Sequence, residues 1–277
     1  MPNSPNSGLI ETRLRVVTWN IWWRLGPWEH RAPAIAATLK TLDPDIIALQ
    51  EVWDDGTDNA AALLAQELGY HYVHVRGADL SGINMGNAIL SRWPITRSET
   101  QTLYGDPQAD EKRAVIYAEI DGPRGPIPIF TTHLNHLQYH SHIRQKQVAD
   151  IAQFIAAQGK QRFPPVLCGD FNADPHSDEI RMLTGQTTVP VAGLAFHDAF
   201  DFCNPGVSGY TWDNANPYVA QVMEPDRRID YIFTGWHKGR GAGHVTDCRI
   251  VGNTAVAGTD GDLWASDHHA LLAELRY

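Results

Sequence analysis

Asp170 and Asn172 lie two residues apart, directly after an apolar run, Val166 to Cys168, that ends at Gly169. If that run is a buried strand, both polar side chains lie at its carboxyl end and point the same way, because side chains alternate along a strand. A carboxylate beside an amide suits a phosphate-and-cation site, since the acid accepts a proton or binds metal and the amide donates to oxygen. The same residue types also form turns, so this stretch alone leaves a simple turn open.

Polar residues also end four other predicted strands: they are Asn20, Glu51, His133 with Asn135, and Asp267-His268, and Asp230 lies inside a sixth strand. Taken singly, each has a plain structural explanation, such as a cap, a solvated strand end or a hydrogen-bonded core histidine. Taken together they predict one shared site. A carboxylate stranded beside an apolar strand is costly unless it is paired or binds metal.

The composition is that of an ordinary globular chain, with 43% hydrophobic and 19% charged residues among 277. A formal net charge of −10 argues against broad nucleic-acid binding, which needs clustered Lys and Arg, and fits carboxylates gathered around a divalent cation. Cys168, Cys203 and Cys248 lack pairing or metal-ligand spacing, which favours reduced thiols and a cytoplasmic location. Residues 1–8 show no signal-sequence pattern, and we expect no transmembrane segment.

Hydrophobic periodicity predicts many strands separated by a few helices. We expect strands over residues 13–20, 45–51, 70–75, 87–91, 95–103, 113–120, 127–133, 166–168, 209–212, 229–234, 244–251 and 268–276. We expect helices over residues 32–42, 59–68, 140–157 and 177–183. This order favours an α/β (α+β) fold of two packed sheets flanked by helices, with a flexible tail over residues 1–10 and one catalytic domain over residues 11–277.

Seven short motifs follow one another along the chain. They are Thr18-Trp-Asn20, Leu49-Gln-Glu51, Gly86-Asn-Ala-Ile-Leu-Ser91, Thr132-His-Leu134, Gly169-Asp-Phe-Asn172, Arg228-Ile-Asp-Tyr231 and Ser266-Asp-His268. In kind and order they resemble the motifs of the endonuclease/exonuclease/phosphatase superfamily, which includes deoxyribonuclease I, exonuclease III and the neutral sphingomyelinases. The resemblance covers residues 13–277. It implies a four-layer α/β/β/α sandwich of two mainly antiparallel sheets, and Mg²⁺- or Mn²⁺-dependent hydrolysis of a phosphate ester.

The resemblance also implies roles for the matching residues. Glu51 would hold the metal directly, helped by Asn20 and Asp267, since oxygen ligands with room for water suit Mg²⁺. His268 would be the general base or a phosphate ligand. Asp230 would orient it, because an acid–imidazole pair fixes the tautomer and raises basicity.

Asp170 would position or deprotonate the attacking water, Asn172 would donate to a phosphoryl oxygen, and His133 would donate to the phosphate or leaving group. Whether Asp170 or His268 takes the proton of the water stays open. Arg144, with Gln147 three residues further along the same predicted helix, is expected to brace the strand of His133. The expected supporting or substrate-contacting residues are Asn87, Arg113, Asn135, Arg144, Trp212 and Arg228.

The sequence leaves the substrate open among nucleic acid, nucleotide, and lipid or sugar phosphate. Thr132-His-Leu134 resembles the deoxyribonuclease I, sphingomyelinase and phosphatase branches, whereas exonuclease III relatives carry a tyrosine-containing motif there. Tyr210-Thr-Trp212, in contrast, is similar to the region that forms the abasic-site pocket in those relatives. The departure at His133 and the acidic charge both weigh against apurinic endonuclease activity.

We expect the protein to be a monomer. Two alternatives to the hydrolase hypothesis stay open. Residues 203–226 contain apolar side chains that could meet a membrane surface, which would make the protein a lipid-headgroup phosphodiesterase resembling neutral sphingomyelinase. The second alternative is a non-catalytic binding module of the same fold. A tryptophan cluster, Trp19, Trp22, Trp23 and Trp28, could stack a base, bury an apolar group or pack in the core.

Overall fold

Two six-stranded sheets form the centre of the protein in the computed structural model, which describes residues 8–105, 112–258 and 261–277. Residues 1–7 of the predicted tail therefore lie outside the described residues. The first sheet has the order β11 (Val245–Val251), β14 (Ala270–Arg276), β1 (Arg13–Asn20), β2 (Ile46–Asp54), β4 (Ile83–Ser91) and β3 (His71–Leu80). The second has the order β5 (Ile95–Thr102), β6 (Ala114–Gly122), β7 (Gly125–His133), β8 (Val166–Asp170), β10 (Asp230–Gly235) and β9 (Phe196–Asp198).

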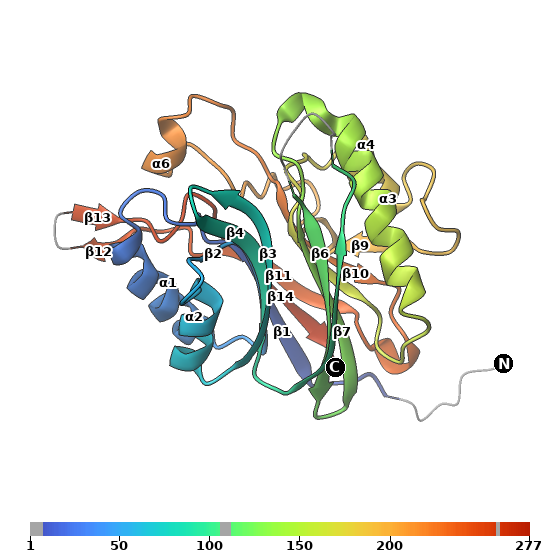
Figure 1. The fold of residues 1–277 in the computed structure, drawn as a ribbon. Helices are drawn as coiled ribbons and strands as arrows, with labels where there is room; N and C mark the ends of the chain where they lie inside the picture. Colours follow the sequence, from blue (N-terminus) through green and yellow to red (C-terminus); the bar gives the residue numbers. More distant parts are fainter. Residues whose placement is uncertain (1–7, 106–111, 259–260) are drawn as a thin grey trace.

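Helices cover the outer faces of both sheets (Figure 1). The first sheet is covered by α1 (Trp28–Leu42) and α2 (Ala60–Leu68), and the second by α3 (Ser141–Ala157) and α4 (Asp178–Thr184). Shorter elements are η1 (Gln138–His140), α5 (Ala199–Cys203), α6 (Pro217–Ala220), η2 (Gly239–Gly241), β12 (Val256–Gly258) and β13 (Gly261–Leu263). The predicted α/β/β/α sandwich is confirmed. None of the helices in the described ranges is long and apolar enough to span a membrane.

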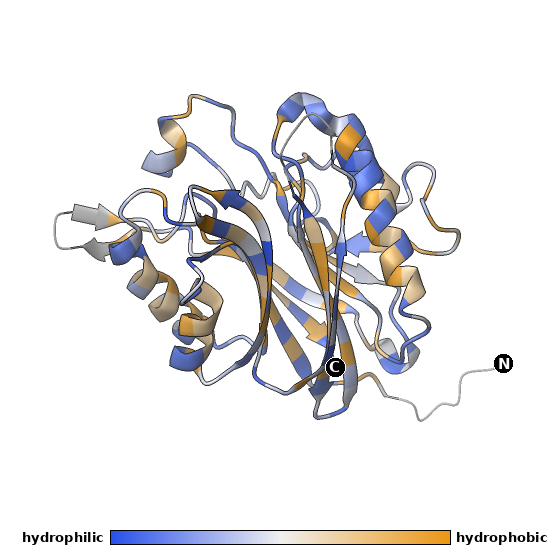
Figure 2. Cartoon of the chain, in the orientation of Figure 1, coloured by the Kyte–Doolittle hydropathy of each residue, from blue (hydrophilic) through white to orange (hydrophobic). Residues whose placement is uncertain are grey.

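The alternation of side chains along each strand builds three apolar layers. Val16 and Ile46 point between the two sheets, whereas their neighbours Val17 and Ile47 point towards α1 and α2. A third layer, which includes Phe130, lies between the second sheet and α3. Central strands such as β2 are buried on both faces, and Figure 2 shows apolar residues mixed with polar ones along the strands of both sheets.

Two crossover connections, each containing a helix, join neighbouring parallel strands. The β1–α1–β2 and β7–α3–β8 segments each make a parallel strand pair, and the other paired neighbours in both six-stranded sheets are antiparallel. The two sheets are therefore mainly antiparallel, as predicted. The crossovers bring the carboxyl ends of β1, β2, β7 and β8 to one edge of the sandwich, and the candidate site lies there.

Several predicted boundaries were wrong. Helix α1 begins at Trp28 rather than at residue 32, and β2 continues past Glu51 to Asp54 through a register shift. Residues 209–212 do not form a strand, because Trp212 makes only an isolated bridge to Arg227. The region 185–227, for which only the short strand over residues 209–212 was predicted, contains β9, α5 and α6.

Candidate active site

Register places three candidate residues of the second sheet side by side. His133 ends β7 opposite Asp170 of β8, and Asp170 lies opposite Asp230 of β10. Gly169 makes this row possible: its φ is +146°, and a Cβ there would lie 2.0 Å from the carbonyl oxygen of Thr132. Only glycine tolerates both this backbone conformation and this contact.

Asn172 joins the row by a turn rather than by strand alternation. Strand β8 ends at Asp170, and Asn172 has a positive φ of 50°. Its backbone N–H donates to Asp170 Oδ1 (2.9 Å), and its side-chain Nδ2 donates to the carbonyl of Leu134 (3.1 Å). The expectation that both residues share one strand face was therefore wrong, although both line the same pocket.

The first sheet contributes Asn20 and Glu51 to the same edge. Asn20 Nδ2 lies 3.3 Å from Glu51 Oε1 and 3.0 Å from Asp170 Oδ2, so one amide connects the two sheets. Glu51 has a positive φ of 54°, in the register shift between Leu49 and Val52. Such a backbone conformation is uncommon for a non-glycine residue, and a bulge of this kind redirects a side chain.

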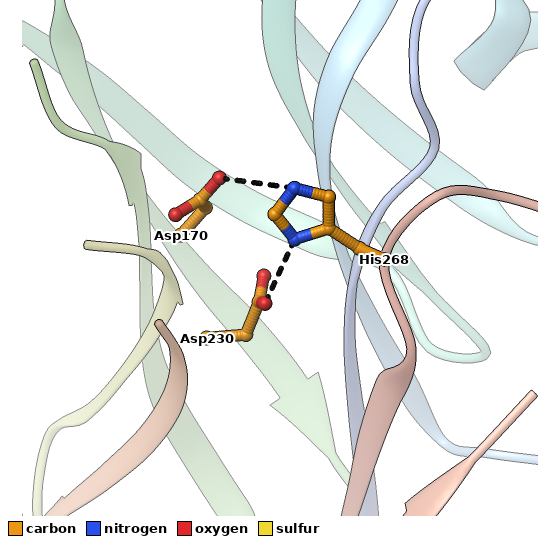
Figure 3. Close-up of side chains that lie close together, drawn as sticks. All are labelled: Asp170, Asp230 and His268. Atoms are coloured by element: carbon orange, nitrogen blue, oxygen red, sulfur yellow. Dashed lines mark hydrogen bonds and ion pairs between the residues drawn. The ribbon is translucent and has the colours of Figure 1, made fainter. Parts of the chain in front are cut away.

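His268 lies between the two aspartates of the second sheet, as Figure 3 shows. Its Nδ1 is 2.9 Å from Asp230 Oδ2, and its Nε2 is 3.8 Å from Asp170 Oδ2. His133 Nε2 approaches the same Asp170 oxygen at 3.4 Å. A hydrogen bond from Trp19 Nε1 to the carbonyl of His268 (2.9 Å) fixes the backbone. Asp170 thus faces two imidazoles, and Asp230 holds one of them.

The two histidines differ in charge because their surroundings differ. Burial lowers the pKa of His133 well below its ordinary value, and the nearby positive charge of Arg113 adds to this effect. Burial also opposes protonation of His268, but the carboxylates of Asp230, Asp267 and Asp170 outweigh it and raise the pKa of His268 well above its ordinary value. Near neutral pH, His133 is neutral and His268 is an imidazolium.

Two groups of side chains could hold a cation. Asp170, Asp230 and His268 each offer a ligand atom, and these atoms lie within 4.8 Å of one another. However, the Asp230 carboxylate and His268 Nδ1 already bind each other. A metal there would have to break the contact that orients the imidazole.

Glu51 and Asp267 form the second group. Burial raises the pKa of both carboxyls, that of Asp267 to about 6, and the negative charge of Glu51 raises the pKa of Asp267 further. A cation between these two half-buried carboxylates would relieve this repulsion. Asn20 adds an amide oxygen, which at present accepts from the Trp22 backbone N–H at 3.0 Å. Hard oxygen donors of this kind fit Mg²⁺ or Mn²⁺.

A pocket of about 490 Å³ opens onto the site. Its polar end is lined by Glu51, His133, Asp170, Asn172 and His268. Its other walls come mainly from the β3–β4 hairpin and two loops, with the apolar residues Trp23, Leu25, Val75, Leu80, Met85 and Leu137. Sequence patterns assigned no role to the apolar hairpin residues Val75, Leu80 and Met85, since apolar residues in a strand ordinarily indicate core.

Three of the expected supporting residues also line this pocket. Asn87 donates to the carbonyl of Ala114 at 3.3 Å, Arg113 lies 3.4 Å from His136 Nδ1, and Asn135 accepts from the backbone N–H of Leu137 at 3.1 Å. The structure therefore brings these side chains together with the acidic residues, as the sequence predicts.

Arg144 lies behind the loop that follows β7. Its guanidinium is buried, donates to Glu179 Oε1 at 2.6 Å and reaches the carbonyls of Asn135 (3.3 Å) and Leu137 (2.7 Å). Gln147 accepts from the Asn135 backbone N–H at 3.0 Å. These bonds fix the loop beyond His133, in the geometry expected of a brace.

Two expected site residues lie elsewhere. Arg228 Nη1 donates to Asp198 Oδ2 at 2.5 Å in a nearly buried ion pair, and neither residue lines the 490 Å³ pocket. A buried guanidinium needs a carboxylate, and β9 supplies one next to β10. Trp212 also lies outside that pocket. Arg228 and Trp212 therefore lie outside the pocket that Glu51, Asp170 and His268 line, and their supporting or substrate-contacting role stays a prediction.

The tryptophan cluster divides between core and pocket. Trp19 is fully buried, and Trp28 packs against Trp53 with ring centroids 5.7 Å apart. Trp23 lines the pocket, whereas Trp22 packs against Tyr218 in a tilted arrangement with ring centroids 4.6 Å apart. Trp19 is therefore a core residue, and Trp23 is the member placed to contact a ligand.

Known proteins with a similar sequence or fold were found in three comparisons. The model of the Endonuclease/Exonuclease/phosphatase family matches residues 17–268. YbhP, an uncharacterized protein of Escherichia coli strain K12, is 29% identical over 175 residues, which cover 57% of this chain and 66% of YbhP. The inositol phosphosphingolipids phospholipase C of Schizosaccharomyces pombe is 27% identical over 256 residues, which cover 79% of this chain and 59% of that protein.

A solved structure shows the same architecture. Truncated TDP2 of Caenorhabditis elegans superposes with a TM-score of 0.74 at 20% identity, covering 97% of this chain and 99% of that one. This chain spans about two thirds or less of the length of the two sequence relatives. With two packed sheets and a family match over residues 17–268, the chain belongs to the Endonuclease/Exonuclease/phosphatase family.

Proposed function

We propose that the protein is a Mg²⁺- or Mn²⁺-dependent phosphoesterase that hydrolyses a phosphate ester by in-line attack of water. Family membership supports the class of phosphoester hydrolases. The observation that carries the proposal is the convergence of Glu51, Asp170 and His268 from both sheets on one pocket. An acid, an imidazolium and further oxygen ligands are the groups that phosphoryl transfer needs.

Asp170 is the group we propose to position the water and accept its proton. It ends β8 at the pocket wall, and Asn20 Nδ2 and the Asn172 backbone N–H each donate to one of its oxygens. These two bonds hold the carboxylate in one orientation. His268 is better suited to donate a hydrogen bond to a phosphoryl oxygen, because the carboxylates around it keep it protonated.

His133 and Asn172 complete the set at the pocket wall. The neutral His133 imidazole can donate from one nitrogen to the phosphate or the leaving group, and the Asn172 amide can donate to a phosphoryl oxygen. Glu51, with Asn20 and Asp267, would hold the divalent cation. When bound, the cation stabilises the negative charge that develops on the phosphoryl group and the leaving oxygen.

The test is hydrolysis of an aryl phosphodiester such as bis(4-nitrophenyl) phosphate. We expect turnover with Mg²⁺ or Mn²⁺, none with excess EDTA, and a loss of several orders of magnitude in Asp170→Asn and His268→Ala. Losses below tenfold in both variants would rule out this site. A folded, metal-binding protein that is inert towards DNA, RNA, nucleotides, phosphoinositides and phospholipids would instead support a non-catalytic binding module.

A second candidate, a lipid-headgroup phosphodiesterase, is favoured by the apolar pocket walls. Leu80 and Met85 of the β3–β4 hairpin, together with Trp23, line the pocket beyond its polar end. There they could contact an apolar substituent of the substrate. Val222 and Met223 are 51% and 89% exposed in the segment 203–226, whose apolar side chains could meet a membrane surface. The S. pombe relative is named for a lipid substrate. Co-sedimentation with liposomes, and turnover of sphingomyelin against bis(4-nitrophenyl) phosphate, would decide between the candidates.

The single catalytic domain over residues 11–277, the monomeric state and the cytoplasmic location remain predictions. Light scattering on the purified protein tests the monomer, for which we expect a mass near 30.8 kDa. A stable mass of twice that value would contradict it.

A further inference from the structure

Arg31 is a buried cation that no part of the proposed chemistry uses. It lies in the first turn of α1 and is 1% exposed. A positive charge near a helix N-terminus opposes the helix dipole, and a buried charge without a directly bonded carboxylate is costly. Because Arg31 is unfavourable on both grounds, we expect its role to be that of holding the groups it contacts in place.

The guanidinium of Arg31 binds five backbone carbonyls. Its three nitrogens donate to the carbonyls of Ile21 (2.9 Å), Trp22 (2.9 Å), Trp23 (3.1 Å), Leu25 (2.9 and 3.2 Å) and Ala265 (3.0 Å). All of its donor groups are therefore engaged, four of the acceptors coming from one loop and one from a distant segment. The loop over residues 21–25 follows Asn20, and Ala265 precedes Ser266-Asp267-His268.

The loop over residues 21–25 is strained and directly connected to the candidate metal ligands. Trp22 and Trp23 both have positive φ, 57° and 37°, which is rare for bulky residues. The Trp23 N–H donates to the carbonyl of Glu51 at 3.1 Å, and Glu51 itself has a positive φ. On the other side, Ser266 Oγ donates to the carbonyl of Asn20 at 2.7 Å. Strain of this kind persists only where the surroundings hold it.

We propose that Arg31 is a positioning residue of the site: its guanidinium fixes the 21–25 loop against the Ala265 segment, so that Asn20, Glu51 and Asp267 face one another. The inference rests on the proposed metal-dependent function. It adds that the geometry of the metal ligands depends on Arg31, which itself contacts neither metal nor substrate. Residues that orient metal ligands through such contacts typically affect metal affinity by about 10- to 100-fold.

The test compares Mn²⁺ binding by the full chain in four variants, with titration calorimetry as the readout. Arg31→Lys keeps the charge but lacks the planar fork, and Arg31→Met removes the charge. Gly26→Ala leaves Arg31 intact and strains the same loop, because Gly26 has a φ of +58° and its Cβ would lie 2.6 Å from the Trp22 ring. Leu39→Ala, a fully buried position on the same helix, is the control for lost stability alone.

We expect Mn²⁺ to bind about 10- to 100-fold more weakly to Arg31→Met, with Arg31→Lys between this variant and wild type. Gly26→Ala should weaken binding in the same direction, and it carries the test if Arg31→Met does not fold. Leu39→Ala should melt at a lower temperature with unchanged Mn²⁺ affinity. Unchanged affinity in folded Arg31→Lys and in Gly26→Ala would overturn the inference, as would an equal loss in Leu39→Ala.

Hydrogen exchange separates this inference from the proposed function. The Ile21 and Trp23 amides donate to the carbonyls of Gln50 and Glu51 at 3.1 Å, and they should exchange faster in Arg31→Lys. If wild type binds no Mn²⁺ while these amides are still loosened, the metal-dependent function fails and Arg31 keeps its role in holding the loop. If their exchange is unchanged, Arg31 does not hold the loop.

Discussion

Replacing Asp230 by asparagine should slow catalysis without changing substrate binding. Asp230 is fully buried, and its Oδ2 lies 2.9 Å from His268 Nδ1. The substitution keeps the shape of the side chain but removes the charge that holds the imidazolium. A hydrogen bond to a charged group contributes about 1.5–3 kcal/mol. Because about 1.4 kcal/mol corresponds to a tenfold change in rate, we expect kcat to fall about 10- to 150-fold.

The assay is steady-state hydrolysis of bis(4-nitrophenyl) phosphate at saturating Mg²⁺, with kcat and KM determined separately. Asp198→Asn is the matched control, since Asp198 is also a nearly buried acid paired with a cation, but its partner Arg228 does not line the site pocket, whereas His268 does. We expect Asp198→Asn to lower the melting temperature and leave kcat within about twofold. A kcat for Asp230→Asn within twofold of wild type, or an equal loss in the control, would refute the role given to this pair.

Three further predictions concern stability and metal. Gly169→Ala should destabilise the fold by about 1–3 kcal/mol or more in urea titrations, since its Cβ would collide with the Thr132 carbonyl; an unchanged midpoint would contradict this. Glu51→Gln should abolish measurable Mn²⁺ binding, and calorimetry with wild-type affinity would exclude Glu51 as a ligand. Burial and the charge of Arg113 lower the pKa of His133, so below about pH 6.5 the unfolded chain binds a proton that the folded chain does not. The contribution of His133 to stability should therefore fall as pH drops from 7.5 to 5.5, by at most about 1.4 kcal/mol per unit. The check is the difference in free energy of unfolding between wild type and His133→Asn at the two pH values, because the opposite contributions of His268 and Asp267 are present in both proteins.

Two features of the sequence both predict the sandwich: the apolar runs that form its strands, and the order of strands and helices along the chain. Apolar runs such as Ile46–Leu49 are too long for a half-exposed strand and are followed by polar residues, which is typical of buried strands that end at a site. The predicted strands and helices then alternate in an order that two packed sheets can accommodate. Local patterns of this kind depend on side-chain type and spacing alone.

Features set by backbone conformation were not predictable in the same way. The Glu51 bulge and the turn at Asn172 place their side chains through positive φ, which no periodicity reveals. The short elements β9, α5 and α6 lie between Gly, Pro and Asn residues and bury few apolar residues, so their periodic signal is weak.

Side-chain partners from distant parts of the chain could not be predicted from the sequence either. Arg228 belongs to a motif of the family, yet its nearest buried carboxylate, on Asp198, comes from a strand that sequence patterns did not predict. Arg31 drew no attention in the sequence because its partners are backbone carbonyls, which every residue has. Conversely, His133, Asp170 and His268 were predicted because each follows or precedes an apolar strand whose pairing fixes where it lies.

Anomalous diffraction from crystals grown with Mn²⁺ would show which residues bind the cation, because it locates the ion independently of any substrate. We expect one strong peak with the carboxylates of Glu51 and Asp267 as ligands and the Asn20 amide beside it. A peak held by Asp170, Asp230 and His268 instead, or no peak at saturating Mn²⁺, would contradict this expectation.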